Sequence, residues 1–565
     1  MQTKQETVSR VGWDARHRNL LLIIPVVAGA LLRIYPYLLY HVPYSTDSWS
    51  PIRNAEVLLA NSPTRLGGNA IFDSYNVYWP ANSIFGGIAS LVLGGAPITV
   101  MPLVMPIISS LTLVFFFLLA EKLTRSTIAA SVATTLFATA GFLAIFSAAI
   151  TKEGFATPFY MLCLYLLVAK RGTDLSTLSL FSVASLVLII SHHATAFVFL
   201  GCAGSIALVE AILSARSGKS VGGKFAYLFI TAGFGILYYL LYAARGLGPL
   251  AGVVSIQNFL VMLSFFAVLL LPTIYFTIGP VGRKNRPPLA EIAVMIAVLV
   301  ILLVGTRTNL IPLEPTLPPE LIFFALPYVL VGFLAIIGHR IMQRGPERES
   351  FAFTAAWLAA LLAFEGFAGF GGDSGGLDMV YRLFDFLYAP AALLASVAIV
   401  YFLQNYGVSL RRGALVLKPI LIILIVGIAS ASAYQTYVAS VQQSNLLGGH
   451  WVYHESDLRS GMWLKDNSGI TTLSGDSREA YILRDYFGIN VSLQSGYEYL
   501  LGVGGGGNAA VSASPSYLIT YSLMERNGYV LDPYAFPLPS GWTQRLENGS
   551  AIYYTNGNDV LWSMP

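Results

Sequence analysis

The sequence predicts an α-helical, polytopic membrane protein with about thirteen transmembrane helices and a small mixed α/β domain at its C-terminal end. Of its 565 residues, 55% are hydrophobic and only 11% are charged, whereas soluble domains carry about 25% charged residues. The mean hydropathy is +0.66. Apolar runs long enough to cross a bilayer recur up to about residue 436 and then stop. These observations exclude a soluble multidomain enzyme, a disordered chain and a fibrous protein.

The thirteen predicted spans follow from the rule that a helix needs roughly 20 apolar residues to cross the hydrocarbon core. Their ranges are 20–40, 98–120, 126–149, 154–169, 176–191, 194–214, 225–242, 253–281, 289–304, 321–338, 351–370, 383–404 and 415–436. The short spans 154–169 and 176–191 indicate broken or partly shielded helices. Segment 83–94 is too short to cross, and predicts a helix that lies on the membrane or dips into it.

Basic residues alternate along the connections between these spans, which sets the orientation of the chain. The N-terminal arm, residues 1–19, is basic, and so is every second connection after it: Lys122/Arg125, Lys170/Arg171, Arg216/Lys219/Lys224, Arg283/Lys284/Arg286, Arg340/Arg344/Arg348 and Arg411/Arg412/Lys418. Because basic loops stay in the cytoplasm, we expect a multi-pass cell-membrane protein with its N-terminus inside and its C-terminus outside. Segment 20–40 lacks a small-residue cleavage site, so it is interpreted as a retained span and not as a signal peptide.

The chain thus divides into a transmembrane domain, 20–436, with a long first outer loop at 41–97, and an extracytoplasmic tail, 437–565. The tail holds eleven acidic residues against six basic ones, a net charge of −5. Short apolar stretches such as Tyr517–Tyr521 and Ala551–Tyr554 alternate there with Gly, Asn and Ser turns, which is typical of strands. About 130 residues are enough for one small soluble domain.

Ionisable residues gather at the outer ends of the spans, where the function of a membrane protein is first sought. The first outer loop holds Asp47 and Arg53, in Ser45-Thr-Asp-Ser-Trp-Ser-Pro-Ile-Arg53, and the second places Glu153 at a helix start, in Ile150-Thr-Lys-Glu-Gly154. An acid at such a position also caps a helix or meets its dipole, so a purely structural role is equally favoured for each carboxylate.

Further candidates lie later in the chain. Glu320 abuts the tenth span, Arg382 lies in the sixth outer loop, and the pair His192-His193 joins the fifth and sixth spans. Arg53, Glu320, Arg382 and the two histidines are candidate substrate-binding residues, although a buried histidine is more often a hydrogen-bonded core residue than a ligand. Asp47, Glu153 and Glu320 offer the oxygen ligands that a hard divalent cation, Mn²⁺ or Mg²⁺, takes beside a lipid-linked phosphate.

The order of these motifs resembles the GT-C class of membrane glycosyltransferases, and within it the catalytic subunit of oligosaccharyltransferase, especially its archaeal forms. In motif the resemblance covers about residues 30–170: Arg33-Ile-Tyr-Pro36, the first-loop run around Asp47, Tyr78-Trp-Pro80 and Thr151-Lys-Glu-Gly-Phe-Ala156. Thirteen spans followed by an outer C-terminal domain are also that family's architecture.

The resemblance implies roles for four residues. Asp47 would be the first-loop acid that holds the metal or acts as a base, Glu153 the last acid of the second-loop motif, and Glu320 the mobile-loop glutamate. Arg382 would meet the donor phosphate or the acceptor. Two departures stand out: Thr151 occupies the place of the first second-loop acid, and the Trp-Trp-Asp-Tyr-Gly motif that reads an Asn-x-Ser/Thr acceptor is missing from 437–565.

The sequence therefore favours an integral membrane glycosyltransferase that moves a sugar or glycan from a polyprenyl-phosphate or -pyrophosphate carrier to an acceptor at the outer face. Its expected partners are that donor, a protein, lipid or glycan acceptor, and membrane lipid, with no nucleic acid. One alternative is a transporter or flippase of a polyprenyl-linked glycan, which predicts charges buried in mid-membrane. Another is a non-catalytic membrane subunit that binds partners through its outer domain.

Overall fold

The computed structural model describes the chain except for residues 1, 62–75, 170–173, 219–222, 247–255, 279–288, 309–317, 346–347, 371–375, 410–412, 444–446, 448–450, 468–469, 471–472, 502–514, 532–533 and 565. Several basic connections used to predict the orientation, among them Arg283/Lys284/Arg286 and Arg411/Arg412, lie outside the described residues. The chain splits into two compact units. Unit 1 is Met1–Leu32, Ile108–Ala144 and Phe155–Gln435, and unit 2 is Arg33–Ile107, Ile145–Gly154 and Thr436–Pro565.

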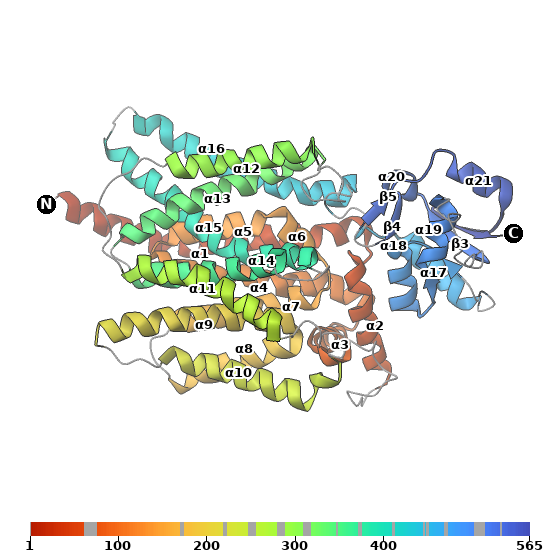
Figure 1. The fold of residues 1–565 in the computed structure, drawn as a ribbon, viewed down its shortest axis with the longest axis horizontal. Helices are drawn as coiled ribbons and strands as arrows, with labels where there is room; N and C mark the ends of the chain where they lie inside the picture. Colours follow the sequence, from red (N-terminus) through yellow and green to blue (C-terminus); the bar gives the residue numbers. More distant parts are fainter. Residues whose placement is uncertain are drawn as a thin grey trace. The chain divides into compact units, whose positions relative to one another are not determined.

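Long helices build unit 1 (Figure 1). They are α1 (Gln2–Tyr40), α4 (Pro97–Thr124), α5 (Thr127–Thr139), α6 (Gly141–Ala148), α7 (Lys152–Ala169), α8 (Leu175–Ser191), α9 (His193–Arg216), α10 (Gly223–Leu241), α11 (Ile256–Ile278), α12 (Leu289–Gly305), α13 (Glu320–Arg344), α14 (Arg348–Phe370), α15 (Gly376–Ser409) and α16 (Gly413–Tyr437), with α1, α4, α6, α7 and α16 continuing into unit 2. Figure 1 shows α8, α9 and α10 side by side, in mutual contact.

The predicted fold class is confirmed, since each of the thirteen predicted spans coincides with a helix or a helix pair. Among the described residues, nine helices are long and apolar enough to cross a membrane, or ten if the pair α5 and α6, bent by 61°, forms one span. Helices α8 and α12 fall just short, with 17 residues each. The number thirteen therefore stays a prediction. The sequence predicted one continuous span at 126–149, whereas the structure has two helices there with a bend between them.

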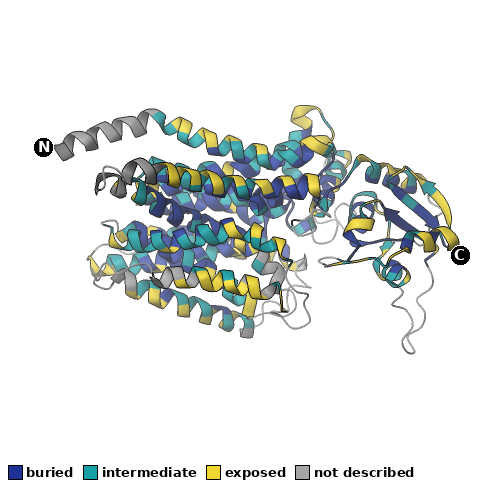
Figure 2. Cartoon of the chain, turned by 90° about the horizontal axis from the view of Figure 1, so that it is seen from above, coloured by how far each residue is buried: buried dark blue, intermediate teal, exposed yellow. Residues whose placement is uncertain are grey.

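Small residues bring the unit 1 helices close together. Ala352, Ala356 and Ala360 form one fully buried stripe along α14, and small residues of this kind let membrane helices approach closely. Gly338 on α13 faces α15 so tightly that an added Cβ would lie 1.8 Å from the Leu394 carbonyl oxygen. Figure 2 shows the outer faces of these helices exposed and their inner faces buried. The exposed faces are apolar, as lipid contact requires.

Unit 2 joins the loop at residues 41–97 to the C-terminal tail. The loop contributes α2 (Trp49–Ala60) and α3 (Ala81–Leu93), and α3, 13 residues long, overlaps the predicted non-spanning helix 83–94. The tail contributes α17 (Glu455–Asp466), α18 (Ser477–Ala480), a π-helix (Tyr481–Phe487), α19 (Leu493–Leu501), α20 (Met524–Asn527) and α21 (Trp542–Gly549).

Seven strands lie in the described part of the tail and confirm its mixed α/β character. They are β1 (Leu473–Ser474), β2 (Val491–Ser492), β3 (Tyr517–Tyr521), β4 (Tyr529–Leu531), β5 (Tyr534–Phe536), β6 (Ala551–Thr555) and β7 (Asp559–Ser563). Five of them form one sheet in the order β2-β1-β3-β7-β6, while β4 and β5 pair separately. Within the sheet β1 runs parallel to β2 and β3, and β7 runs antiparallel to β3 and β6.

The core of unit 2 combines the loop with the tail. Trp49 of α2 is fully buried, and its ring centroid lies 5.0 Å from that of Tyr453 and 5.6 Å from that of Tyr486. Aromatic pairs at these separations add stability beyond the area that they bury. The first loop is therefore part of the same hydrophobic core as the tail.

Candidate functional site

The segment that carries Asp47 begins with unusual backbone. His41 and Ser45 have φ values of 54° and 75°, a region that non-glycine residues enter at a cost of about 1–3 kcal/mol each. A single 3-10 turn, Thr46–Ser48, follows, and the Ser45 hydroxyl accepts a hydrogen bond from the Asp47 N–H at 3.4 Å. The Asp47 side chain is exposed. The chain thus holds this carboxylate at the surface on a constrained backbone.

Ser48 connects the first and second outer loops. Its side chain is fully buried, and its hydroxyl donates to the Tyr44 carbonyl while accepting a hydrogen bond of 2.9 Å from the Ile150 N–H. These two loops are 102 residues apart in sequence. The residue next to Asp47 therefore contacts the residue next to Thr151, and the two acidic motifs that the sequence predicted to act together meet in unit 2.

The second loop places Glu153 at the start of α7. The Thr151 hydroxyl accepts a hydrogen bond of 2.8 Å from the Gly154 N–H, which makes Thr151 the N-cap of this helix. Glu153 lies in the first turn and is only 4% exposed. The structure thus gives Thr151, which stands where the resemblance expects an acid, a capping role.

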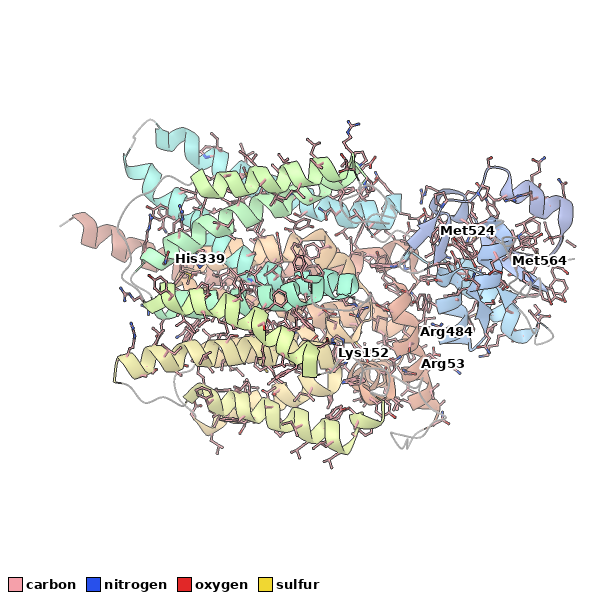
Figure 3. The ribbon with its side chains drawn as sticks, in the orientation of Figure 1. Arg53, Lys152, His339, Arg484, Met524 and Met564 are labelled. Atoms are coloured by element: carbon pink, nitrogen blue, oxygen red, sulfur yellow. The ribbon has the colours of Figure 1, made fainter. Side chains whose placement is uncertain are left out.

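Lys152 brings a positive charge to the residues where the two loops meet. The loop cluster consists of Asp47, Ser48, Arg53, Asn76, Lys152 and Glu153. The Lys152 ammonium donates to the side-chain Oδ1 of Asn76, and the Nδ2 of the same amide donates to the Ser50 hydroxyl at 2.5 Å. Figure 3 labels Lys152, at the start of α7, and Arg53, on α2. Sequence reasoning missed Asn76 and Ser48, because neutral polar residues in a loop give no signal until their partners are known.

Arg53 belongs to a second chain of contacts on α2. Its guanidinium lies 3.8 Å from the Glu56 carboxylate, which also accepts a hydrogen bond of 2.9 Å from the Tyr486 hydroxyl of the tail. Burial is the main cause that raises the pKa of Glu56, while Tyr486 and Arg53 lower it. The Arg53 side chain remains 44% exposed, so its charge stays available to a ligand.

The remaining predicted site residues lie in unit 1. Glu320 is the exposed first residue of α13, and Arg382 is exposed within α15. The prediction that Arg382 lies in a loop is wrong, because α15 already begins at Gly376. His192 caps the start of α9, is 7% exposed, and has its Nδ1 2.8 Å from the Thr195 hydroxyl. The His193 ring lies 5.2 Å from the His192 ring.

The residues of the loop cluster do not fit a divalent cation. Mn²⁺ or Mg²⁺ takes a full shell of oxygen ligands, but Asp47 and Glu153 are the two candidate carboxylates in unit 2, Thr151 caps a helix, and Lys152 adds a positive charge beside Glu153. In the described part of the chain, no group of three or more His, Cys, Asp or Glu residues has the arrangement of a metal site.

Comparisons with known proteins test the resemblance. No family model matches the sequence, and no curated protein matches it either. Among solved structures, the oligosaccharyltransferase of Archaeoglobus fulgidus is similar in several states, including three with different bound molecules. With a tethered acceptor peptide containing an NVT sequon, the TM-score is 0.55 at 15% identity, over 91% of this chain and 70% of that one.

The other two states agree. The complex with Zn and sulfate gives a TM-score of 0.54 at 14% identity, covering 96% of this chain and 73% of that one. The protein named AglB, bound to an inhibitory peptide and a dolichol-phosphate, gives 0.53 at 13% identity, covering 91% and 70%. At these identities the likeness concerns the fold alone. The chain therefore shares the fold of the archaeal oligosaccharyltransferase.

Proposed function

We propose that the chain is an integral membrane glycosyltransferase that moves a sugar or glycan from a polyprenyl-phosphate or -pyrophosphate carrier to an acceptor at the outer membrane face. The observation that carries the proposal is the hydrogen bond from the Ile150 N–H to Ser48, which joins the two acidic loops within an oligosaccharyltransferase-type fold. The A. fulgidus protein was solved with a dolichol-phosphate, which supports the choice of a lipid-linked donor.

In the proposed reaction, Asp47 is the general base. It takes the proton of the acceptor group as that group attacks the first carbon of the sugar, and the bond from this carbon to the carrier phosphate breaks. The phosphate leaves with the bonding electrons. Asp47 suits this role because its carboxylate is exposed on constrained backbone, and a positioned base contributes typically 10²–10⁴-fold to a rate.

Positive side chains would stabilise the leaving phosphate. Lys152 and Arg53 supply an ammonium and a guanidinium in unit 2, and Arg382 remains the predicted phosphate contact in unit 1. A guanidinium suits phosphate because it forms paired, charge-assisted hydrogen bonds. Glu320, His192 and His193 stay predicted substrate contacts.

The acceptor is proposed to differ from the Asn-x-Ser/Thr peptides of standard N-glycosylation. The Trp-Trp-Asp-Tyr-Gly motif that reads such peptides is missing from the sequence. The acceptor class, whether protein, lipid or glycan, is therefore left to the transfer assay.

The test is sugar transfer by the purified protein in lipid, with a labelled polyprenyl-linked sugar pool and a panel of acceptors. We expect Asp47→Ala to lower transfer 10²–10⁴-fold and Glu153→Ala to lower it more than 10-fold. The matched control is Glu455→Ala, which removes an exposed acid of the tail and should leave transfer unchanged. A chelator, and Mn²⁺ added back, should change transfer by less than about 2-fold because the residues do not fit a cation.

Two outcomes would contradict the proposal. If Asp47→Ala transfers as well as the wild type, its carboxylate is a structural group and not a base. If the wild type transfers no labelled sugar to any acceptor, a flippase assay with the same labelled lipid in sealed vesicles becomes the next measurement.

A further inference from the structure

A cavity of about 430 Å³ lies in unit 1, and none of the candidate site residues described above lines it. Its walls come from α1, the end of α4, the end of α7, α9, and the starts of α10 and α14. Four cationic and three anionic side chains line it, together with apolar residues such as Leu118, Leu123, Val168 and Phe353. The cavity thus combines charged and apolar surface.

The carboxylate of Glu121, one of the three acids that line the cavity, is paired with neighbouring side chains of the cavity wall. Arg18 approaches Glu121 through two nitrogens, with its Nη2 at 2.8 Å and its Nε at 3.0 and 3.1 Å from the two carboxylate oxygens. The Thr127 hydroxyl donates to the same carboxylate at 2.9 Å. The negative charge of Glu121 is therefore largely compensated by its own neighbours, and it opposes an anionic ligand only weakly.

A buried lysine forms another part of the wall. Lys224 is 5% exposed; its ammonium donates to the Leu167 carbonyl, lies 3.8 Å from the Glu210 carboxylate, and lies 4.6 Å from the centre of the Phe353 ring. Burying an ammonium is expensive unless it has such partners. These contacts place one ammonium in the wall and offset the charge of Glu210.

Two further cations lie where α4 ends. Lys122 and Arg125 are both exposed and both line the cavity, and Arg125 has a left-handed backbone with φ 52° that turns the chain after the helix. Glu349 and Ser350, at the start of α14, complete the polar lining. With Glu121 and Glu210 each compensated by a cation, the rest of the lining carries more positive than negative charge.

The place of the cavity in the chain indicates its surroundings. Lys122, Arg125 and Lys224 belong to the basic connections that the positive-inside rule assigns to the cytoplasmic side. Basic pockets between membrane helices on the cytoplasmic side bind the phosphate of acidic lipid headgroups. The apolar residues of the wall would contact the first carbons of the acyl chains.

We propose that this cavity binds a phosphate group, supplied by the headgroup of an acidic membrane lipid. The proposal does not depend on the glycosyltransferase reaction, since it uses no residue of the loop cluster.

The test uses the full chain, purified in a neutral detergent, and native mass spectrometry with a short-chain phosphatidylglycerol as the probe and phosphatidylcholine as the neutral comparison. The variant Lys122→Gln/Arg125→Gln changes two exposed residues, so folding should be kept. We expect it to lower phosphatidylglycerol occupancy at least 5-fold and to leave phosphatidylcholine occupancy unchanged. The control Arg216→Gln removes an exposed base at the end of α9 that does not line the cavity, and should change occupancy by less than 2-fold.

A parallel arm measures thermal stability with inorganic phosphate. If millimolar phosphate stabilises the wild type but not the double variant, while phosphatidylglycerol binds both equally, the phosphate site is supported and its source is soluble. The proposal is overturned if the double variant binds both probes as the wild type does. It is also overturned if Arg216→Gln lowers binding as much as the double variant, because general surface charge would then explain the result.

Discussion

Unit 2 contains two charged clusters that the chain treats in opposite ways. In the tail, Arg478 is fully buried; its guanidinium pairs with Asp457 at 2.5 Å and with Glu479, donates to the Val452 carbonyl, and lies between the rings of Tyr453 and Tyr521. In the loops, Asp47 is exposed, and the loops are joined by the hydroxyl of Ser48.

The contrast indicates where this unit uses charge for folding and where it offers charge to a ligand. Removing charges from water costs several kcal/mol per ion, and only complete pairing repays it. The Arg478 guanidinium has such pairing and no access to solvent, so we assign its cluster to the fold. In the loop cluster, hydrogen bonds between neutral groups hold the two loops in place, while the side chains of Asp47 and Arg53 stay in contact with solvent. That arrangement suits a site that must exchange substrate.

The largest expected effect comes from breaking the buried cluster. Arg478→Met should destabilise the unit by about 3–5 kcal/mol, because Asp457 and Glu479 would remain buried without their cation. The matched control is Arg459→Gln, which breaks an ion pair to Glu455 whose two side chains are 66% and 71% exposed, and should cost less than about 1 kcal/mol. Chemical denaturation followed by tail fluorescence measures both. Equal losses in the two variants would remove the distinction between the clusters.

A second prediction concerns the pH dependence of the buried cluster. Burial, with help from Asp457, raises the pKa of Asp559 to about 7 from an ordinary value of 3.8, and burial also raises the pKa of Asp476. The folded tail therefore keeps a proton that the unfolded chain releases, so its stability should fall as pH rises from about 4 to about 7 and level off above that. The slope is at most about 1.4 kcal/mol per pH unit for each such proton.

Hydrogen exchange of β3 and β7 in the full protein, corrected for intrinsic rates, measures this dependence. Asp559→Asn, which cannot ionise, should show a smaller pH dependence than the wild type. Protection that increases between pH 4 and 7 in the wild type would show that Asp559 is ionised in the folded state.

The smallest expected effect tests how the loop cluster is positioned. Thr151→Ala removes the N-cap of α7 and should cost about 0.5–2 kcal/mol, seen as faster exchange of the amides just after Thr151. Thr151→Ser keeps the capping hydroxyl and should behave as the wild type. If alanine and serine variants exchange alike, the contact of Thr151 with Gly154 does not stabilise the helix start.

Much of the fold followed from the sequence, but the details of the site did not. Apolar runs predicted the helices because lipid imposes length and composition together, and Tyr517–Tyr521 was recognisable as a strand from its composition. The bend at Ala140 was not, since both halves of 126–149 are apolar and neither Gly nor Pro composition alone predicts a break there. The first and second loops were expected to share one face, whereas the contacts of Ser48 and Asn76 depend on tertiary partners 102 and 76 residues away.

The buried state of Trp49 has a consequence for how the protein can be divided. Because this indole from the first loop fills the space between Tyr453 and Tyr486, a fragment made of residues 437–565 would lack a large side chain of its own interior. Losing a buried tryptophan costs on the order of 3–5 kcal/mol, a large share of the stability of a small domain. An excised tail would need the α2 helix supplied in trans, and the two pieces would then behave as complementary halves of a split protein.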